Sequence, residues 1–263
     1  MKVRSVVAIF FVVFCLCGIT QVSHGMPILP GGTSDYWTWT ASDSEGRSAS
    51  ADFYFADGKF NILLENTAGA TTVPNTVLAG LFFDLVDGFS ISNPHVEVAV
   101  GSTLQGLVTG GAGYNMDGEF GYLAGIDGIN GGLGDYGIAA TGFDPEDGAP
   151  VDWDGFGADT IINTDYSFPS PSASSPNGAE AGLVGGNIDN LVTASIASYV
   201  QSAVLIQFDF EWPGEIPDSV VSQVNFLYGT DYAGTPVPEP KTMLLLGVGL
   251  LSMVAVRKKT VKK

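Results

Sequence analysis

The feature that most constrains the fold is an alternation of apolar and polar side chains on both sides of a tight-turn signal, Asp57-Gly58. The apolar positions are Ala51, Phe53 and Phe55 before this turn and Phe60, Ile62 and Leu64 after it. A period of two places such a set on one face of a β-strand. Asp-Gly favours the backbone of a two-residue hairpin turn. The sequence therefore predicts a β-hairpin over Arg47–Asn66.

Other segments have the composition of strands. Thr76–Leu85 is apolar on both faces, which is typical of a central strand. Further strands are predicted over His95–Val100, Ala203–Trp212 and Val220–Tyr228. Only Ile188–Val200 has a pattern that would suit a short helix. Regular short strands separated by turn signals predict an all-β fold, an antiparallel β-sandwich.

The middle of the chain, Gly101–Gly186, is rich in Gly and in Asp-Gly pairs, which predicts turns and long loops between short strands. Ser167–Pro176 is a low-complexity loop, either a plain flexible one or one that carries O-linked sugar. Loops of this length often carry a function where a discrete site exists.

The N-terminus has the pattern of a secretory signal peptide. Lys2 and Arg4 precede an uninterrupted apolar run, Val6–Ile19, and Ser23 and Gly25 provide small residues for a signal peptidase. We expect cleavage after Gly25, which leaves a mature chain that begins at Met26.

Loss of this segment removes both cysteines and one of the two histidines. The exported domain then has no disulfide, no thiol nucleophile and no histidine cluster for zinc. A Ser-His-Asp triad would depend on His95. We expect His95 to be a surface or strand-edge residue instead of a general base.

The charge of the domain excludes one class of partner. Residues 26–240 contain two basic residues, Arg47 and Lys59, against all 28 acids, a formal charge of −26. Such a field repels nucleic acid and attracts cations. Aromatic and β-branched residues are plentiful, which distinguishes the domain from an acidic disordered segment.

The C-terminus, residues 237–263, has three parts. The tripeptide Pro238-Glu239-Pro240 precedes an uncharged apolar run over residues 242–256. The basic cluster that follows consists of Arg257, Lys258, Lys259, Lys262 and Lys263. A helix over the run would be about 22 Å long, a marginal transmembrane span against a hydrocarbon core of about 30 Å. The basic cluster would keep its end in the cytoplasm.

A simple membrane anchor would need the run and the charges but not the two prolines. The whole pattern resembles the PEP-CTERM sorting signal of exopolysaccharide-producing Gram-negative bacteria. The resemblance implies that a membrane-embedded enzyme, exosortase, recognises Pro238-Glu239-Pro240 and removes the tail during export.

Three internal segments also resemble a domain shared by exosortase-dependent surface proteins. They are LLENT (Leu63–Thr67), VLAGLFFDL (Val77–Leu85) and FLYGTD (Phe226–Asp231). This second resemblance implies a surface protein and assigns it no activity.

Two kinds of site stay open as alternatives. The acidic turns Asp144–Gly148, Asp152–Gly155 and Gly131–Asp135 are either solvated or weak calcium sites, and none has the spacing of an EF-hand. Trp37 and Trp39 share one strand face, where they would anchor a core or stack on sugar rings. We favour solvated turns and a core position.

The sequence thus predicts three parts: a signal peptide over residues 1–25, an acidic β-sandwich over 26–236 and a sorting segment over 237–263. We expect a non-enzymatic protein of the cell surface or extracellular matrix, without a cofactor, with a structural or adhesive role beside exopolysaccharide. Its expected partners are signal peptidase, exosortase, the membrane before processing, and polysaccharide, but not nucleic acid. A carbohydrate-binding module or a polysaccharide hydrolase, which would need two carboxylates across a cleft, remains the alternative.

Overall fold

The computed structural model describes residues 36–126, 132–140, 160–163, 165, 181–188, 198–214, 219–229 and 235–236. The predicted signal peptide, the loop Ser167–Pro176 and the tail from Val237 onward lie outside these residues, as do the acidic turns at 144–148 and 152–155. Within the described part, no helix is long and apolar enough to cross a membrane.

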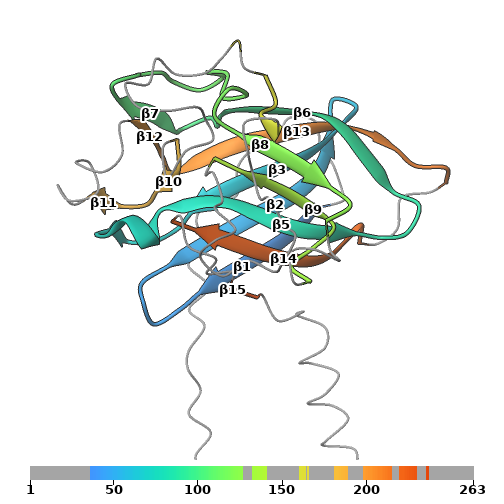
Figure 1. Ribbon diagram of the computed structural model, residues 1–263, viewed down its shortest axis with the longest axis horizontal. Helices are drawn as coiled ribbons and strands as arrows, with labels where there is room; N and C mark the ends of the chain where they lie inside the picture. The colour runs from blue at the N-terminus through green and yellow to red at the C-terminus, as the bar shows by residue number, and fades with distance from the viewer. Residues whose placement is uncertain are drawn as a thin grey trace, which may run out of the picture. The chain divides into compact units, whose positions relative to one another are not determined.

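The first of two large sheets has five antiparallel strands in the order β1-β2-β3-β13-β6 (Figure 1). Its strands are β1 (Tyr36–Ser42), β2 (Ser48–Ala56), β3 (Lys59–Asn66), β13 (Ala203–Glu211) and β6 (Ser90–Val98). The predicted hairpin is confirmed as β2 and β3. Asp57 and Gly58 join them with φ angles of 54° and 73°, the left-handed backbone that a two-residue turn of this kind needs.

The second sheet has eight strands along the order β15-β14-β5-β10-β12-β7, with β8 and β9 off this path. Its strands are β15 (Thr235–Pro236), β14 (Val221–Tyr228), β5 (Leu78–Leu85), β10 (Leu183–Val184), β12 (Ser198–Gln201), β7 (Thr103–Gly106), β8 (Gly121–Ala124) and β9 (Tyr136–Ala139). β5 pairs with β14 on one side and with β9 and β10 on the other, which confirms its predicted central position. A small pair, β4 (Ala70–Thr71) and β11 (Asn187–Ile188), and one 3₁₀ turn, η1 (Pro74–Thr76), complete the described elements.

The inward faces of the two large sheets share one hydrophobic core. Phe53 of β2 and Phe83 of β5 contact each other across it, with ring centroids 5.8 Å apart, and Phe83 also lies 6.5 Å from Phe208 of β13. Each such aromatic pair contributes about 0.5–1.5 kcal/mol beyond the burial of its area. Two mostly antiparallel sheets packed through one core are what the strand pattern predicted.

Asn66, at the end of β3, connects the two sheets with polar contacts. Its buried side-chain amide donates to the carbonyl of Thr76 at 3.1 Å and to that of Leu183 in β10 at 2.8 Å. Its side-chain oxygen accepts the N–H of Ala68 at 3.1 Å. One side chain thus satisfies three buried backbone groups between the sheets.

Two secondary-structure predictions need correction. The segment Ile188–Val200, predicted as a short helix, is strand at both ends: Ile188 belongs to β11, and Ser198–Gln201 form β12 between β10 and β7. Its middle, residues 189–197, lies outside the described residues. Ladder pairing and burial of Ser198 and Val200 outweigh a weak helical period. The strand predicted from His95 begins five residues earlier, at Ser90, because β6 pairs along most of β13.

Candidate functional site

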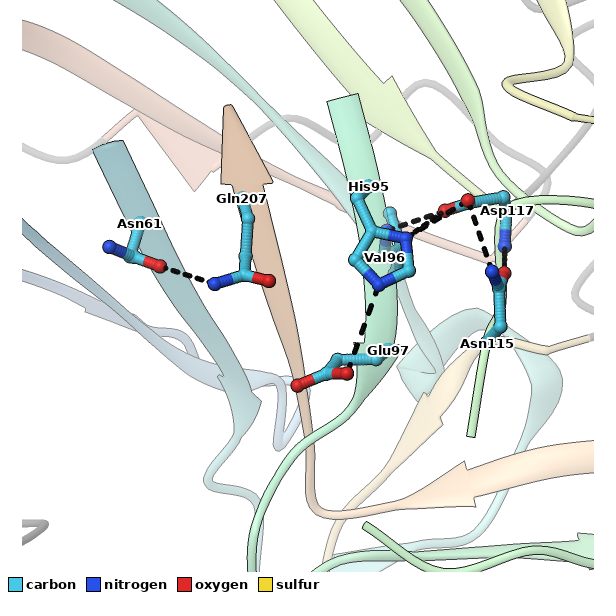
Figure 2. Close-up of polar contacts among 7 residues, drawn as sticks. All are labelled: Asn61, His95, Val96, Glu97, Asn115, Asp117 and Gln207. Carbon is cyan, nitrogen blue, oxygen red and sulfur yellow. Dashed lines mark hydrogen bonds and ion pairs between the residues drawn. The ribbon is translucent and has the colours of Figure 1, made fainter. Parts of the chain in front are cut away.

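The outward face of the five-stranded sheet carries a row of polar and aromatic side chains in register across all five strands. From β1 to β6 the row consists of Tyr36, Tyr54, Asn61, Gln207 and His95. Their neighbours along each strand point into the core, as the period of two requires. Figure 2 shows the end of this row at β3, β13 and β6.

Amide hydrogen bonds orient the middle of the row. Gln207 donates from Nε2 to Oδ1 of Asn61 at 2.9 Å. Asn61 in turn donates from Nδ2 to the carbonyls of Lys59, at 3.1 Å, and Ala56, at 3.3 Å. Because these carbonyls only accept, they fix which end of each amide faces the other.

His95 ends the row on the edge strand β6, so the predicted strand-edge position is confirmed. Its Nδ1 lies 3.0 Å from both carboxylate oxygens of Asp117, and its Nε2 lies 3.8 Å from Oε2 of Glu97 (Figure 2). The hydrogen bond to Asp117 is the main cause that raises the pKa of His95, and burial of the ring opposes it. Both ring nitrogens face carboxylates, and no serine hydroxyl contacts the imidazole in the described structure.

Asp117 also closes the open edge of β6. The chain before it runs alongside the strand: Val98 donates to the carbonyl of Tyr114 at 3.0 Å, and Met116 donates to the carbonyl of Val96 at 2.8 Å. The carboxylate of Asp117 then accepts the N–H of Val96 at 2.7 Å, in the place that a further strand residue would take. Unpaired strand edges promote pairing with other chains, and this segment blocks that route.

Asp117 is a residue that the sequence did not single out, since it stands in an ordinary Asp-Gly turn. The turn is confirmed, but the carboxylate is only 10% exposed and is held from two sides. Asn115 accepts the N–H of Asp117 at 2.8 Å and donates to its Oδ2 at 3.3 Å. The spacing Asn-x-Asp-Gly is the one local signal that would have indicated an ordered turn.

A covered carboxylate lies beside the opposite end of the row, on the same face of β2. Asp52 of β2 points outward but is only 7% exposed, and burial, the largest cause, raises its pKa, while hydrogen bonds with Thr38 and Tyr36 act in the opposite direction. Its Oδ1 is buried without a hydrogen-bond partner. Burial disfavours the charged carboxylate, and an oxygen buried without a partner adds to that cost, in agreement with the raised pKa of Asp52.

Both basic residues of the domain are engaged in the fold. Arg47 forms an ion pair with Asp43 at 2.5 Å, and its guanidinium lies 5.5 Å from the ring centroid of Tyr228 in β14. Lys59 pairs with Asp209 at 2.5 Å. The strong negative field of the domain is therefore not offset by an unpaired lysine or arginine side chain in the described part.

The other predicted site residues fall into two groups. Trp39 is buried in the core and Trp37 packs against it, 5.9 Å from the ring of Phe55, so the favoured core position is confirmed for both. In the described ranges no group of three or more His, Cys, Asp and Glu residues is arranged to hold a metal ion. The candidate calcium turns lie outside those ranges, except that residues 132–135 of Gly131–Asp135 are included.

The last described strand leads directly to the tail. β15 pairs with β14 through Thr235 opposite Phe226 and Pro236 opposite Asn225. Residues 236–259, which begin within β15, match the family model described as the PEP-CTERM protein-sorting motif. The tail is a PEP-CTERM sorting signal. No curated protein and no solved structure matches the chain.

The PEP-CTERM match confirms the resemblance drawn from Pro238-Glu239-Pro240 and the apolar and basic parts behind it. It supports an exported protein that is sorted by an exosortase to the surface or the extracellular space, with transient membrane anchoring. The motif residues, the run 242–256 and the basic cluster from Arg257 to Lys263 lie outside the described residues. The match concerns the tail and assigns no activity to the β domain.

Proposed function

We propose that this chain is a non-enzymatic surface protein whose acidic β-sandwich has a structural or adhesive role in association with exopolysaccharide. The observation that carries the proposal is the PEP-CTERM motif at residues 236–259, which supports export and sorting. A protein sorted to the surface or the extracellular space would be in contact with exopolysaccharide, and the proposed matrix role is based on that contact.

The proposed route has three steps. Signal peptidase removes the leader after Gly25, and the apolar run 242–256 then holds the chain in the membrane with its basic end in the cytoplasm. Pro238 and Pro240 cannot continue a helix, and they bias their neighbours to extended backbone. Exosortase recognises this tripeptide, removes the tail and passes the domain outward.

Three features of the described part support a structural role over catalysis. The His95 imidazole is held between the carboxylates of Asp117 and Glu97 and has no nucleophile beside it. Trp37 and Trp39 serve the core. Both basic residues make their long-range contacts within the fold, Arg47 with the ring of Tyr228 and Lys59 with the carboxylate of Asp209.

Replacement of Pro238, Glu239 and Pro240 together by Ala tests the sorting step. The apolar run and the charges that flank it remain, so the energy of membrane insertion barely changes. In a host with exosortase we expect wild type to be shortened near Pro240 and exported, and the triple variant to accumulate in the membrane at full length. Mass spectrometry of both fractions measures this.

Two controls complete the experiment. Deletion of residues 241–263 should release a protein without membrane retention, and in a host without exosortase wild type and variant should both stay in the membrane. Normal shortening and display of the triple variant would show that the tripeptide is incidental and that the tail is only an anchor.

A carbohydrate-binding module is the second candidate function. The observation that favours it is the outward row that ends in Gln207 and His95, since amide, imidazole and carboxylate side chains suit recognition of hydroxyl groups. A polysaccharide hydrolase remains a weaker alternative. It would be supported only by turnover of a labelled polymer that a single carboxylate substitution abolishes.

A further inference from the structure

The outward row of the five-stranded sheet differs in exposure from one end to the other. Tyr54 is 7% exposed and Asn61 only 2%, so the part of the row over β2 and β3 is covered. At the other end Gln207 is half-buried, and the side chains of His95 and Glu97 are 36% and 28% exposed. Because the middle of the row is covered, a ligand could contact two neighbouring strands of it over β13 and β6.

The hydrogen-bond network determines what Gln207 presents to such a ligand. Asn61 uses Nδ2 on two backbone carbonyls and turns Oδ1 toward Gln207. Gln207 must therefore donate from Nε2 to this oxygen. Its Oε1 is left as a hydrogen-bond acceptor with no partner in the described structure. The buried amide of Asn61 thus orients the partly exposed amide of Gln207.

The same logic applies to His95. Asp117 is an acceptor and takes the hydrogen bond from Nδ1. Nε2 therefore carries a lone pair when the ring is neutral, above its raised pKa, and a proton facing Glu97 when the ring is charged. The carboxylate of Glu97 follows on the same face of β6. Gln207 is directly opposite His95 in the ladder, and these three side chains form what we call the acceptor patch.

An apolar side chain lies within the patch. Leu205 points outward from β13, is half-buried, and pairs directly with Glu97. The patch therefore offers hydrogen-bond acceptors around a small apolar surface. That combination is complementary to a sugar ring, which has hydroxyl donors at its rim and C–H groups on its face.

We propose that the acceptor patch of Gln207, His95 and Glu97, with Leu205, binds the hydroxyl groups of a neutral polysaccharide. An anionic polymer is disfavoured because residues 26–240 carry a formal charge of −26 and their two basic residues are paired elsewhere. This inference rests on the proposed surface role, and it names the site and the class of polymer that would serve that role.

The test uses the processed protein recovered from its native host and measures its affinity for three soluble polymers. A neutral glucan is the probe, an alginate supplies negative charge, and a chitosan supplies positive charge. We expect binding to the glucan that persists in 0.5 M salt, where charge effects are screened. Gln207→Ala and Glu97→Ala should each weaken it at least tenfold.

Two matched controls remove an amide or a carboxylate outside the acceptor patch. They are Gln223→Ala on β14 and Asp87→Ala in the exposed turn before β6. These should bind within twofold of wild type, and thermal unfolding verifies that every variant is folded. If Gln207→Ala unfolds because Asn61 loses its partner, Glu97→Ala still decides the outcome.

Three results would overturn the proposal: no binding of the neutral glucan, glucan binding that both patch variants retain, or binding of chitosan alone that salt abolishes. None of these affects the sorting step, since export and tail removal are read by mass spectrometry and not by affinity. A protein that is shortened and displayed but binds no glucan would refute only the acceptor patch.

Discussion

The carboxylate of Asp117 holds three groups at once: the imidazole of His95, the N–H of Val96 and the side chain of Asn115. It therefore couples the charge of one histidine to the closure of a sheet edge. Protonated His95 adds a charge-assisted hydrogen bond to this arrangement. Solvent screening limits the gain, because more than a third of the His95 side chain is exposed.

This coupling predicts a pH dependence of stability. Asp117 raises the pKa of His95 in the folded state, so the folded protein binds the proton more tightly than the unfolded chain does. The resulting stabilisation is fully present below the unfolded-state pKa of about 6.5 and disappears as pH rises through the higher folded-state value. The Tm advantage of wild type over His95→Gln should therefore shrink on going from about pH 5.5 to pH 9.

The expected change in Tm is at most about 2–4 °C, the effect of about 1 kcal/mol on a domain of this size. Thermal unfolding of both proteins across the pH range measures it. Asp117→Asn placed in the His95→Gln protein should add no further pH dependence between pH 6 and 9. A Tm difference that does not change with pH would contradict the coupling.

The position of His95 on a strand edge could be predicted from sequence, but its partner could not. Asp117 is one of several Asp-Gly turns in the Gly-rich middle of the chain, and local sequence treats them alike. What distinguishes it is that its turn passes the open edge of β6, a contact between segments about twenty residues apart. The registers of distant strands, which decide such contacts, are not encoded in local periodicity.

Among the elements, three sequence segments, LLENT (Leu63–Thr67), VLAGLFFDL (Val77–Leu85) and FLYGTD (Phe226–Asp231), contact one another through their described residues. Asn66 of LLENT donates to Thr76, immediately before VLAGLFFDL. Gly229 of FLYGTD donates to the carbonyl of Val77 at 2.8 Å. These contacts are polar and backbone connections that join β3, β5 and β14.

Asn66→Ala should therefore be strongly destabilising. It leaves the buried carbonyls of Thr76 and Leu183 and the N–H of Ala68 without their partner. We expect a loss of about 2–4 kcal/mol, because each orphaned buried group costs about 1–3 kcal/mol and the site relaxes in part. Urea unfolding measures the loss.

Gln201→Ala is the matched control, since Gln201 also donates to a backbone carbonyl, that of Gly186, but at an exposed site. Its effect should stay within about 0.5 kcal/mol. Equal effects of the two substitutions would refute the role of Asn66 as a connection between the sheets.

The strands themselves were largely predictable, and the exceptions have a common cause. The hairpin, the central β5 and the long β13 and β14 all have strong alternation or long apolar runs. The misassigned segment, Ile188–Val200, ends in a strand of four residues whose place in the sheet depends on β10 and β7. Strands this short contain too few residues to show a period.

At the scale of the whole molecule, charge dominates. The exported domain has a formal charge of −26, and its two basic residues are neutralised within the fold. Self-repulsion of this size destabilises a compact state, so cations in the surroundings should stabilise it. The question is whether any cation does so specifically.

The acidic turns at residues 144–148 and 152–155, which lie outside the described residues, were left open as weak calcium sites, and a preference for calcium tests that alternative. If these turns bind calcium, millimolar Ca²⁺ should raise the Tm of the exported protein more than the same concentration of Mg²⁺ at matched ionic strength. Specific binding to the folded state stabilises by mass action, whereas screening treats the two ions alike. Equal shifts would leave only screening, and Asp152→Asn with Asp154→Asn should abolish any difference.

The pairing of β15 with β14 has a consequence for how far the domain can stand from whatever holds its C-terminus. Pro236 is fixed in the ladder, and a single residue, Val237, separates it from Pro238. Since an extended residue spans at most about 3.6 Å, the stretch from Pro236 to Pro240 reaches no more than about 15 Å. Such a short tether leaves the domain without a stalk, so partners must come close to the point of attachment to meet it.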